Sequence, residues 1–290
     1  MQEKGKQTRP REEAIIRDLL QLDDATEIIF NDCGWTSRVY IIRDGEIAFK
    51  FPRNESVKEE YRFEVPACKT AHHIRGDVLI PEILWEHPDR DYIGYRGVVG
   101  APLDQVSQSL SKDEKAGIGA ALGTFLKQFH QQDLAGAPTI SLESESAEHE
   151  KTMELSLPTA SRHFTHNEVS AIRGLVSKHY PARMAKLGLN KGLCHGDLGY
   201  WNMIHSGDRR VGIIDFGDTG YRDVSIDFAG MTDVEVLDAA LAAYGSHVER
   251  EKIELQMRII PILDLTFFVG KEDQQGIERT VRRIREVSLA

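Results

Sequence analysis

The sequence contains little cysteine, three residues in 290, and no C-x-x-C spacing. Scattered cysteines of this kind argue against a disulfide framework and a zinc site. No segment offers about 18 uninterrupted apolar residues, and the charged first residues lack an apolar stretch behind them. We therefore expect reduced thiols, no membrane span and a soluble, cytoplasmic protein. The cysteines are Cys33, Cys68 and Cys194.

An excess of positive charge is also missing, because 36 Lys and Arg face 46 Asp and Glu, for a net charge of −10. This balance disfavours a nucleic-acid partner and favours a cationic small molecule, although solubility alone would also explain it. We find no internal repeat and no low-complexity block. The length suits one large domain or two lobes, and we expect a monomer.

Two motifs in the second half of the chain carry chemistry: H-G-D-L-G-Y-W-N at 195–202 and G-I-I-D-F-G-D at 212–218. Moving a γ-phosphoryl group requires a base for the attacking hydroxyl and metal ions that neutralise the phosphate oxygens. Asp197 can accept the hydroxyl proton, while Asn202 and Asp215 offer the hard oxygen ligands that Mg²⁺ prefers. The spacing therefore predicts a phosphoryl-transfer site.

Each motif alone also fits an ordinary loop or turn, and only their order and spacing together favour this chemistry. Val211–Ile214 is a short apolar run typical of a buried strand, so Asp215 and Asp218 should follow the end of that strand. We expect His195 to hold the loop in shape rather than to act as a base.

The pattern H-G-D-L-x-x-x-N followed by I-I-D-F-G-D resembles the aminoglycoside phosphotransferase family, bacterial antibiotic kinases that share the protein-kinase fold. Gly196 and the additional Asp218 favour these enzymes over protein kinases, which more often have H-R-D. The landmarks extend from about Phe30 to the C-terminal helices. The resemblance implies ATP or GTP as co-substrate, Mg²⁺, an aminoglycoside hydroxyl as acceptor, as in the 2″-phosphotransferase branch, and antibiotic resistance.

Hydrophobic periodicity predicts an α+β, two-lobe fold, with an antiparallel sheet first and mostly helices afterwards, and the resemblance implies that this fold is protein-kinase-like. We expect a nucleotide-binding lobe over 1–97, a catalytic and substrate-binding lobe over 98–290, and the ATP site between them. Asp44-Gly45 predicts a two-residue hairpin, and Ser111 to Glu114 form a capping box. Strands are expected at 27–30, 38–42, 46–51, 83–86 and 92–99, helices at 11–22, 56–74, 112–132, 165–180, 181–187, 233–244, 248–269 and 274–287, and a connecting loop at 135–150.

Lys50 is a charge in an apolar strand and therefore needs an anion. In the protein-kinase fold the strand lysine contacts the α and β phosphates and pairs with a glutamate of the first large helix. Glu64 is the first choice for that glutamate. Glu60 is the alternative, because Pro66 could place Glu64 in the first helical turn. Without a site, Lys50 would be a lysine that extends to solvent from an edge strand.

The segment 31–38 has one glycine where protein kinases have a G-x-G-x-x-G loop. By resemblance, Ser37 and nearby backbone amides would cover the phosphates. The carbonyl of Arg96 and the amide of Val98 would likewise contact the nucleobase. Such backbone contacts leave the choice between ATP and GTP open.

Three carboxylates of the second half are candidates for binding the ammonium groups of the substrate. Asp218 and Asp233 resemble acidic positions of the 2″-phosphotransferase branch, whereas Asp264 is a charge in an apolar helix that needs a partner. Asp233 could instead cap a helix, and Asp264 could pair with an arginine. By resemblance, Asp227 is a structural acid behind the catalytic loop.

Other readings stay open. A macrolide kinase should have a more apolar pocket with few carboxylates, and choline-type or sugar-type kinases belong to the same superfamily. A catalytically weak drug-binding homologue is the non-enzyme alternative. It is disfavoured because Lys50, Asp197, Asn202 and Asp215 are all present. The identity of the antibiotic and of its hydroxyl cannot be derived from these motifs.

Overall fold

The computed structural model describes residues 2–32 and 34–289, with side chains from Thr8 onward, so Cys33 lies outside the described residues. The chain forms two compact units, one containing residues 1–109 and 201–217 and the other residues 110–200 and 218–290. The lobes expected at 1–97 and 98–290 were assigned by function, as nucleotide-binding and substrate-binding parts, and this assignment stays a prediction. No described helix has the length and apolar character needed to cross a membrane.

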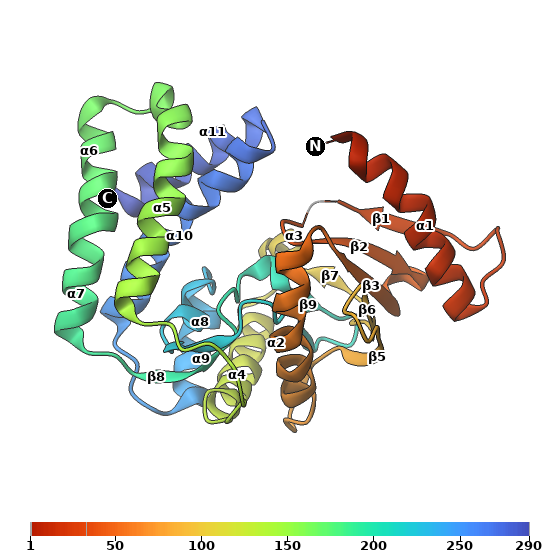
Figure 1. The fold of residues 1–290 in the computed structure, drawn as a ribbon. Helices are drawn as coiled ribbons and strands as arrows, with labels where there is room; N and C mark the ends of the chain where they lie inside the picture. The colour runs from red at the N-terminus through yellow and green to blue at the C-terminus, as the bar shows by residue number, and fades with distance from the viewer. Residues whose placement is uncertain (1, 33, 290) are drawn as a thin grey trace. The chain divides into compact units, whose positions relative to one another are not determined.

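A five-stranded antiparallel sheet organises the first unit, in the order β1-β2-β3-β6-β5 (Figure 1). This confirms the antiparallel sheet predicted for the N-terminal part. The strands are β1 Ile28–Asn31, β2 Ser37–Ile42, β3 Ile47–Pro52, β5 Glu82–Glu86 and β6 Ile93–Arg96.

The connection between β2 and β3 is longer than predicted. Ile42 pairs with Ile47, so four residues connect the strands instead of two. The left-handed backbone begins at Arg43, with φ of 52°, and the amide of Glu46 donates to the carbonyl of Arg43 at 3.0 Å. The two-residue prediction was wrong because Arg43 and Glu46, which flank Asp44-Gly45, belong to the turn and not to the strands.

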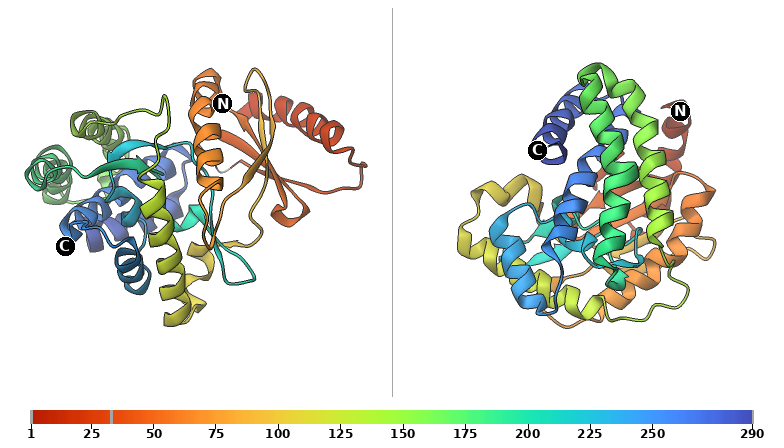
Figure 2. Two further views of the ribbon diagram at one scale, coloured as in Figure 1. Left: turned by 90° about the horizontal axis from the view of Figure 1, so that it is seen from below. Right: turned by 90° about the vertical axis from the view of Figure 1, so that its left-hand side faces the viewer.

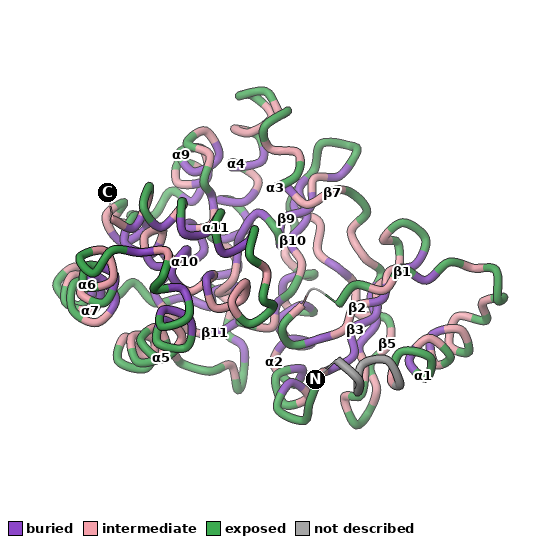
Figure 3. Tube along the Cα trace, turned by 90° about the horizontal axis from the view of Figure 1, so that it is seen from above, coloured by how far each residue is buried: buried purple, intermediate pink, exposed green. Residues whose placement is uncertain are grey.

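Strand register gives the sheet two faces with different partners. Helix α1 (Gln2–Leu20) covers the face with Tyr40 and Phe49, and helix α2 (Glu55–His72) packs against the face with Ile93 and Tyr95. In Figure 3, buried residues lie along β2 and β3. Because antiparallel partners share a face, Lys50, which pairs with Ile93, projects on the α2 side.

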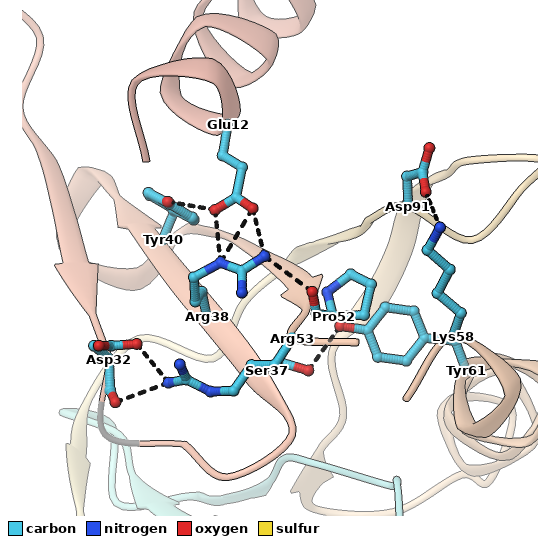
Figure 4. A network of polar contacts seen from close by, with 10 residues as sticks. All are labelled: Glu12, Asp32, Ser37, Arg38, Tyr40, Pro52, Arg53, Lys58, Tyr61 and Asp91. Atoms are coloured by element: carbon cyan, nitrogen blue, oxygen red, sulfur yellow. Dashed lines mark hydrogen bonds and ion pairs between the residues drawn. The ribbon is translucent and has the colours of Figure 1, made fainter. Parts of the chain in front are cut away.

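A partly buried ion pair attaches α1 to its face of the sheet (Figure 4). The Glu12 carboxylate accepts hydrogen bonds from the Arg38 guanidinium at 2.6 Å and from the Tyr40 hydroxyl at 2.6 Å. Arg38 also donates to the carbonyl of Pro52 at 2.9 Å. Both β2 and the end of β3 are thereby tied to the first helix.

A second sheet of the same unit has the order β4-β10-β9-β7. It consists of β4 Val78–Leu79, β7 Ala101–Pro102, β9 Met203–His205 and β10 Val211–Ile213. Strand β10 confirms the buried strand predicted before Asp215. The first unit thus contains Asn202 and Asp215 together with β3 and α2, whereas residues 195–200 and Asp218 belong to the second unit.

The second unit is mainly helical, with one small antiparallel pair of strands, β8 (Lys191–Cys194) and β11 (Gly220–Asp223). The predicted capping box at Ser111 is confirmed at the start of α4. In Figure 2, α5 and the run from α6 to α7 lie beside α10. The helices are α4 Lys112–Phe129, α5 Leu142–Ala160, α6 His166–Gly174, α7 Tyr180–Leu187, α8 Ile226–Ala229, α9 Val234–Tyr244, α10 Arg250–Gly270 and α11 Gln274–Arg283.

Helix α5 corrects the prediction of a connecting loop over 135–150. The helix begins at Leu142, where the Ser141 hydroxyl accepts a hydrogen bond from the amide of Ser144 at 3.1 Å. Its polar first half hid the helical pattern, and Met153, Leu157 and Ala160 of the second half enter the core. The prediction was wrong because core packing of a few residues outweighs a polar composition.

Candidate functional site

Lys50 lies at the centre of an ion cluster in the first unit, in which Lys50 and Glu64 are buried and Asp215 is exposed. Its Nζ is 2.6 Å from Glu64 Oε1 and 2.9 Å from Asp215 Oδ1. Burial alone would lower the pKa of Lys50, but the charges of Asp215 and Glu64 outweigh burial and hold this pKa well above its ordinary value. The ammonium therefore remains charged and can bind an anion.

The glutamate partner of Lys50 is Glu64 rather than Glu60. Helix α2 begins at Glu55 and continues through Pro66, so Glu64 lies in the third turn and not in the first. Asn54 caps the helix by accepting a hydrogen bond from the amide of Val57 at 3.2 Å. Because α2 starts at Glu55 and not near Pro66, Glu64 lies well inside the helix.

Tyr95 is a part of this cluster that the sequence motifs do not indicate. Its hydroxyl donates to Glu64 Oε1 at 3.0 Å, on the same oxygen that faces Lys50. Burial raises the pKa of Tyr95 well above its ordinary value, so the hydroxyl keeps its hydrogen and remains a donor. Only the register of β3 with β6, which pairs Ala48 with Tyr95, could have placed this residue beside Lys50.

Asn202 and Asp215 flank the β9–β10 ribbon at the same end. Met203 pairs with Ile213, Asn202 directly precedes Met203, and the amide of Ile214 donates to the carbonyl of Asn202 at 3.0 Å. Asp215 follows with φ of 67°, a left-handed conformation that a non-glycine residue adopts at a cost. One amide and one carboxylate are hard oxygen donors that fit Mg²⁺.

In the second unit, Asp227 holds the loop that carries Asp197. Asp227 accepts hydrogen bonds from the backbone amides of His195 and Gly196, each at 2.8 Å, and contacts His130 Nε2 at 3.0 Å. Burial alone would raise the pKa of Asp227, but the contacts with His130 and the loop amide hold it below its ordinary value. His130 Nε2 therefore donates to the carboxylate, and its Nδ1 lies 3.0 Å from the Tyr244 hydroxyl. The expected structural role of Asp227 is confirmed.

The turn between His195 and Asp197 requires glycine. Gly196 has φ of 89°, and a Cβ at this position would lie 2.4 Å from the carbonyl oxygen of Asp218. The amide of Asp197 donates to His195 Nδ1 at 3.3 Å, so the histidine ring holds the loop, as expected. These contacts leave the Asp197 side chain half-buried on an anchored backbone.

The groups behind this loop include a thiol that could suggest a metal site. Atoms of His130, Cys194 and Asp227 lie within 4.8 Å of one another. Burial raises the pKa of the Cys194 thiol well above its ordinary value, and the Asp227 oxygens already accept hydrogen bonds. We assign the three residues to a hydrogen-bonded network that supports the loop.

The substrate candidates of the second unit differ in their partners. Asp218 is exposed, and its carbonyl accepts a hydrogen bond from Arg222 at 2.9 Å. Asp233 precedes α9, but its side chain forms no cap and contacts Lys115 Nζ at 2.5 Å. Asp233 thus occupies the N-cap position of α9, as its alternative role expects, but its carboxylate pairs with Lys115 instead of capping the helix.

Asp264 lies on α10, 3.3 Å from Nη1 of Arg283 on α11, which is the arginine pairing considered as its alternative role. Burial raises the pKa of Asp264 to about 6, and Arg283 offsets this only in part. The free protein thus contains a carboxylate whose charge is poorly compensated.

Asp264→Asn is expected to stabilise the free protein at pH 8 by about 1 to 2 kcal/mol and to have little effect at pH 4. The folded pKa lies above the unfolded value of 3.8, so the folded state binds more protons between these values and stability falls as pH rises through about 4 to 6. Urea unfolding at both pH values measures the effect. Lower stability of the variant at pH 8 would contradict this account.

The expected nucleotide contacts Ser37, Arg96 and Val98 all belong to the first unit. Ser37 is buried, whereas Arg96 ends β6 and its side chain pairs with Glu82 at 2.7 Å. Arg96 and Val98 line a pocket of about 350 Å³ together with residues of β4 and of the loop between β9 and β10. Their contact with a nucleobase stays a prediction.

A family model described as "Phosphotransferase enzyme family" matches residues 27–255. The GDP and kanamycin complex of APH(2″)-IIIa is similar in structure, with a TM-score of 0.79, 18% identity, and coverage of 96% of this chain and 98% of that chain.

Two other small-molecule kinases have a similar fold. The macrolide 2′-phosphotransferase MphH from Brachybacterium faecium has a TM-score of 0.61 and 15% identity, with coverage of 93% of this chain and 97% of that chain. The choline kinase LicA from Streptococcus pneumoniae has a TM-score of 0.64 and 17% identity, with coverage of 94% and 98%. At these identities the similarity shows the kinase-like fold, and not the substrate.

Proposed function

Because the chain belongs to the phosphotransferase enzyme family, we propose that it is a kinase that transfers the γ-phosphate of ATP or GTP to a hydroxyl of an aminoglycoside. The ion cluster of Lys50, Glu64 and Asp215 is the observation that carries this proposal. A permanently charged lysine beside a carboxylate and an amide suited to Mg²⁺ is what binding of a nucleoside triphosphate requires. The similarity to a kinase bound to GDP and kanamycin supports the choice of substrates.

Each side chain has a defined task in the proposed reaction. Lys50 binds the α and β phosphates, and Glu64 and Tyr95 keep its ammonium in place. Asn202 and Asp215 would hold Mg²⁺, which when bound neutralises charge on the phosphate oxygens. Asp197 accepts the proton of the acceptor hydroxyl while the new O–P bond forms, and the bond to the leaving nucleoside diphosphate breaks.

The acceptor is proposed to be cationic because of the carboxylates in the second unit. Asp264 has a raised pKa and only a partial partner, so an ammonium group of the substrate would stabilise its charged form. Asp218 is exposed directly after the second motif. Asp233 is also proposed to bind the substrate, but we rank it below the other two because Lys115 already compensates its charge.

Nucleotide consumption by the purified protein tests this proposal. ATP and GTP are each supplied with Mg²⁺ and with kanamycin, erythromycin or choline as acceptor. We expect consumption to increase with kanamycin, and mass spectrometry should show one added phosphoryl group on the drug. Stimulation by erythromycin or choline alone would overturn the aminoglycoside assignment, and no stimulation by any acceptor would contradict the proposal as stated.

A further inference from the structure

Tyr61 and Ser37 form a buried pair of hydroxyl groups that the proposed chemistry has not used. Tyr61 Oη lies 2.7 Å from Ser37 Oγ, and the two residues are 1% and 2% exposed (Figure 4). Tyr61 comes from α2, and Ser37 is the first residue of β2. The bond therefore connects the helix to the end of the segment 31–37 that is proposed to cover the phosphates.

The location of this pair relates it to Lys50. Ser37 pairs with Pro52, and Val39 with Lys50, so Ser37 and Lys50 project from the same face of the sheet. Tyr61 lies one helical turn before Glu64, and Lys50 Nζ is 5.9 Å from the centre of the Tyr61 ring. One turn of α2 thus contacts both the ammonium and the phosphate-covering segment.

The remainder of the segment is held from β3. Arg53 donates to the carbonyls of Gly34 at 3.0 Å and Asp32 at 2.9 Å, and its amide donates to the carbonyl of Thr36 at 2.9 Å. These bonds fix the segment to Arg53, directly after β3. The Tyr61 hydroxyl links the end of the segment to α2.

We propose that Tyr61 is a positioning residue for the nucleotide: through Ser37 it anchors the phosphate-covering segment to the helix that carries Glu64. This inference rests on the proposed function. Ser37 is too deeply buried to be the main phosphate contact, so backbone amides of residues 34–37 cover the phosphates and the Ser37 hydroxyl serves as the anchor. Burial raises the pKa of Tyr61, so the hydroxyl keeps its hydrogen for this bond.

Calorimetric titration with Mg-ATP and Mg-GTP tests the anchor without any acceptor. Tyr61→Phe and Ser37→Ala are each expected to raise the Kd of the nucleotide by roughly threefold to tenfold, since one hydrogen bond shifts an equilibrium by about this factor. The double variant should be no weaker than either single variant, because both remove the same bond. The KM of the acceptor should not change.

Tyr40→Phe is the matched control, since it removes a buried tyrosine hydroxyl from the opposite face, where it bonds Glu12. It should lower the melting temperature about as much as Tyr61→Phe does, yet leave the Kd of the nucleotide unchanged. An equal Kd change in the two variants would show a general loss of stability and overturn the inference. A much larger loss for Ser37→Ala than for Tyr61→Phe would also overturn it, because Ser37 would then touch the phosphate directly.

The failure of the proposed function is distinguishable from these outcomes. Lys50→Met removes the proposed phosphate ligand and should abolish nucleotide binding measured in the same way. If neither ATP nor GTP binds to the unaltered protein, the proposed function fails and the inference fails with it. If nucleotide binds and depends on Lys50 but not on Tyr61, only the inference fails.

Discussion

Replacing Asp197 with asparagine is expected to lower the kcat of kanamycin-dependent nucleotide consumption by roughly 10²- to 10⁴-fold, the range that a positioned base contributes. The amide has nearly the same shape but cannot accept the proton of the attacking hydroxyl. The loop should keep its conformation, because its bonds to Asp227 use the backbone amides of His195 and Gly196. Steady-state kinetics with both substrates measure the change.

The Kd of Mg-ATP separates a lost base from a damaged protein. Lys50, Asn202 and Asp215 belong to the first unit and Asp197 to the second, so nucleotide binding should be largely retained in Asp197→Asn. Asp238→Asn is a suitable control, since this exposed carboxylate contacts Arg250 on the surface and should tolerate the change. A kcat above a tenth of the unaltered value would exclude Asp197 as the base.

Local patterns were sufficient to predict the sheet of the first unit and the need of Lys50 for an anionic partner. Alternating or continuous apolar runs identified the strands, and a charge inside one of them identified Lys50 as a residue that needs an anion. Motif spacing placed Asp215 directly after a strand, which is where β10 ends. Strand positions and the residues at strand ends depend on neighbours in the sequence, so the sequence alone can predict them.

Features that depend on register or on distant packing could not be predicted. The choice of Glu64 over Glu60 required knowing that α2 continues through Pro66, with Glu64 packed against Lys50 of β3. The contacts of Tyr95 and Tyr61 depend on how β6 and α2 meet β3. Helix α5 was missed because its polar half carries no periodic signal.

The charges of the substrate candidates illustrate the same limit. Sequence indicated that Asp264 needs a partner, but its distance of 3.3 Å from Arg283 follows from the packing of α10 against α11. Lys115 and Asp233 are 118 residues apart and still form an ion pair. Whether a carboxylate is available to a cationic ligand therefore depends on neighbours that no local pattern reveals.

Asp227→Asn is expected to lower the free energy of unfolding by about 3 kcal/mol, because it disrupts a fully buried carboxylate and its hydrogen bonds. One carboxylate oxygen accepts from Gly196, and the other accepts from both His195 and His130. The amide group of asparagine can replace only one acceptor, so its NH₂ must face an N–H donor. Urea unfolding at pH 7, followed by fluorescence, measures the loss.

The same variant should also lose turnover, although Asp227 has no proposed contact with the substrate. The backbone on either side of Asp197 would no longer be held, and a misplaced base loses efficiency steeply with distance. Kinetics at a temperature where the variant is fully folded separate this effect from unfolding, and Asp238→Asn again provides the surface control. Full stability together with unchanged kcat would mean that His130 and the loop amides find other partners, and the support of Asp197 by Asp227 would have to be abandoned.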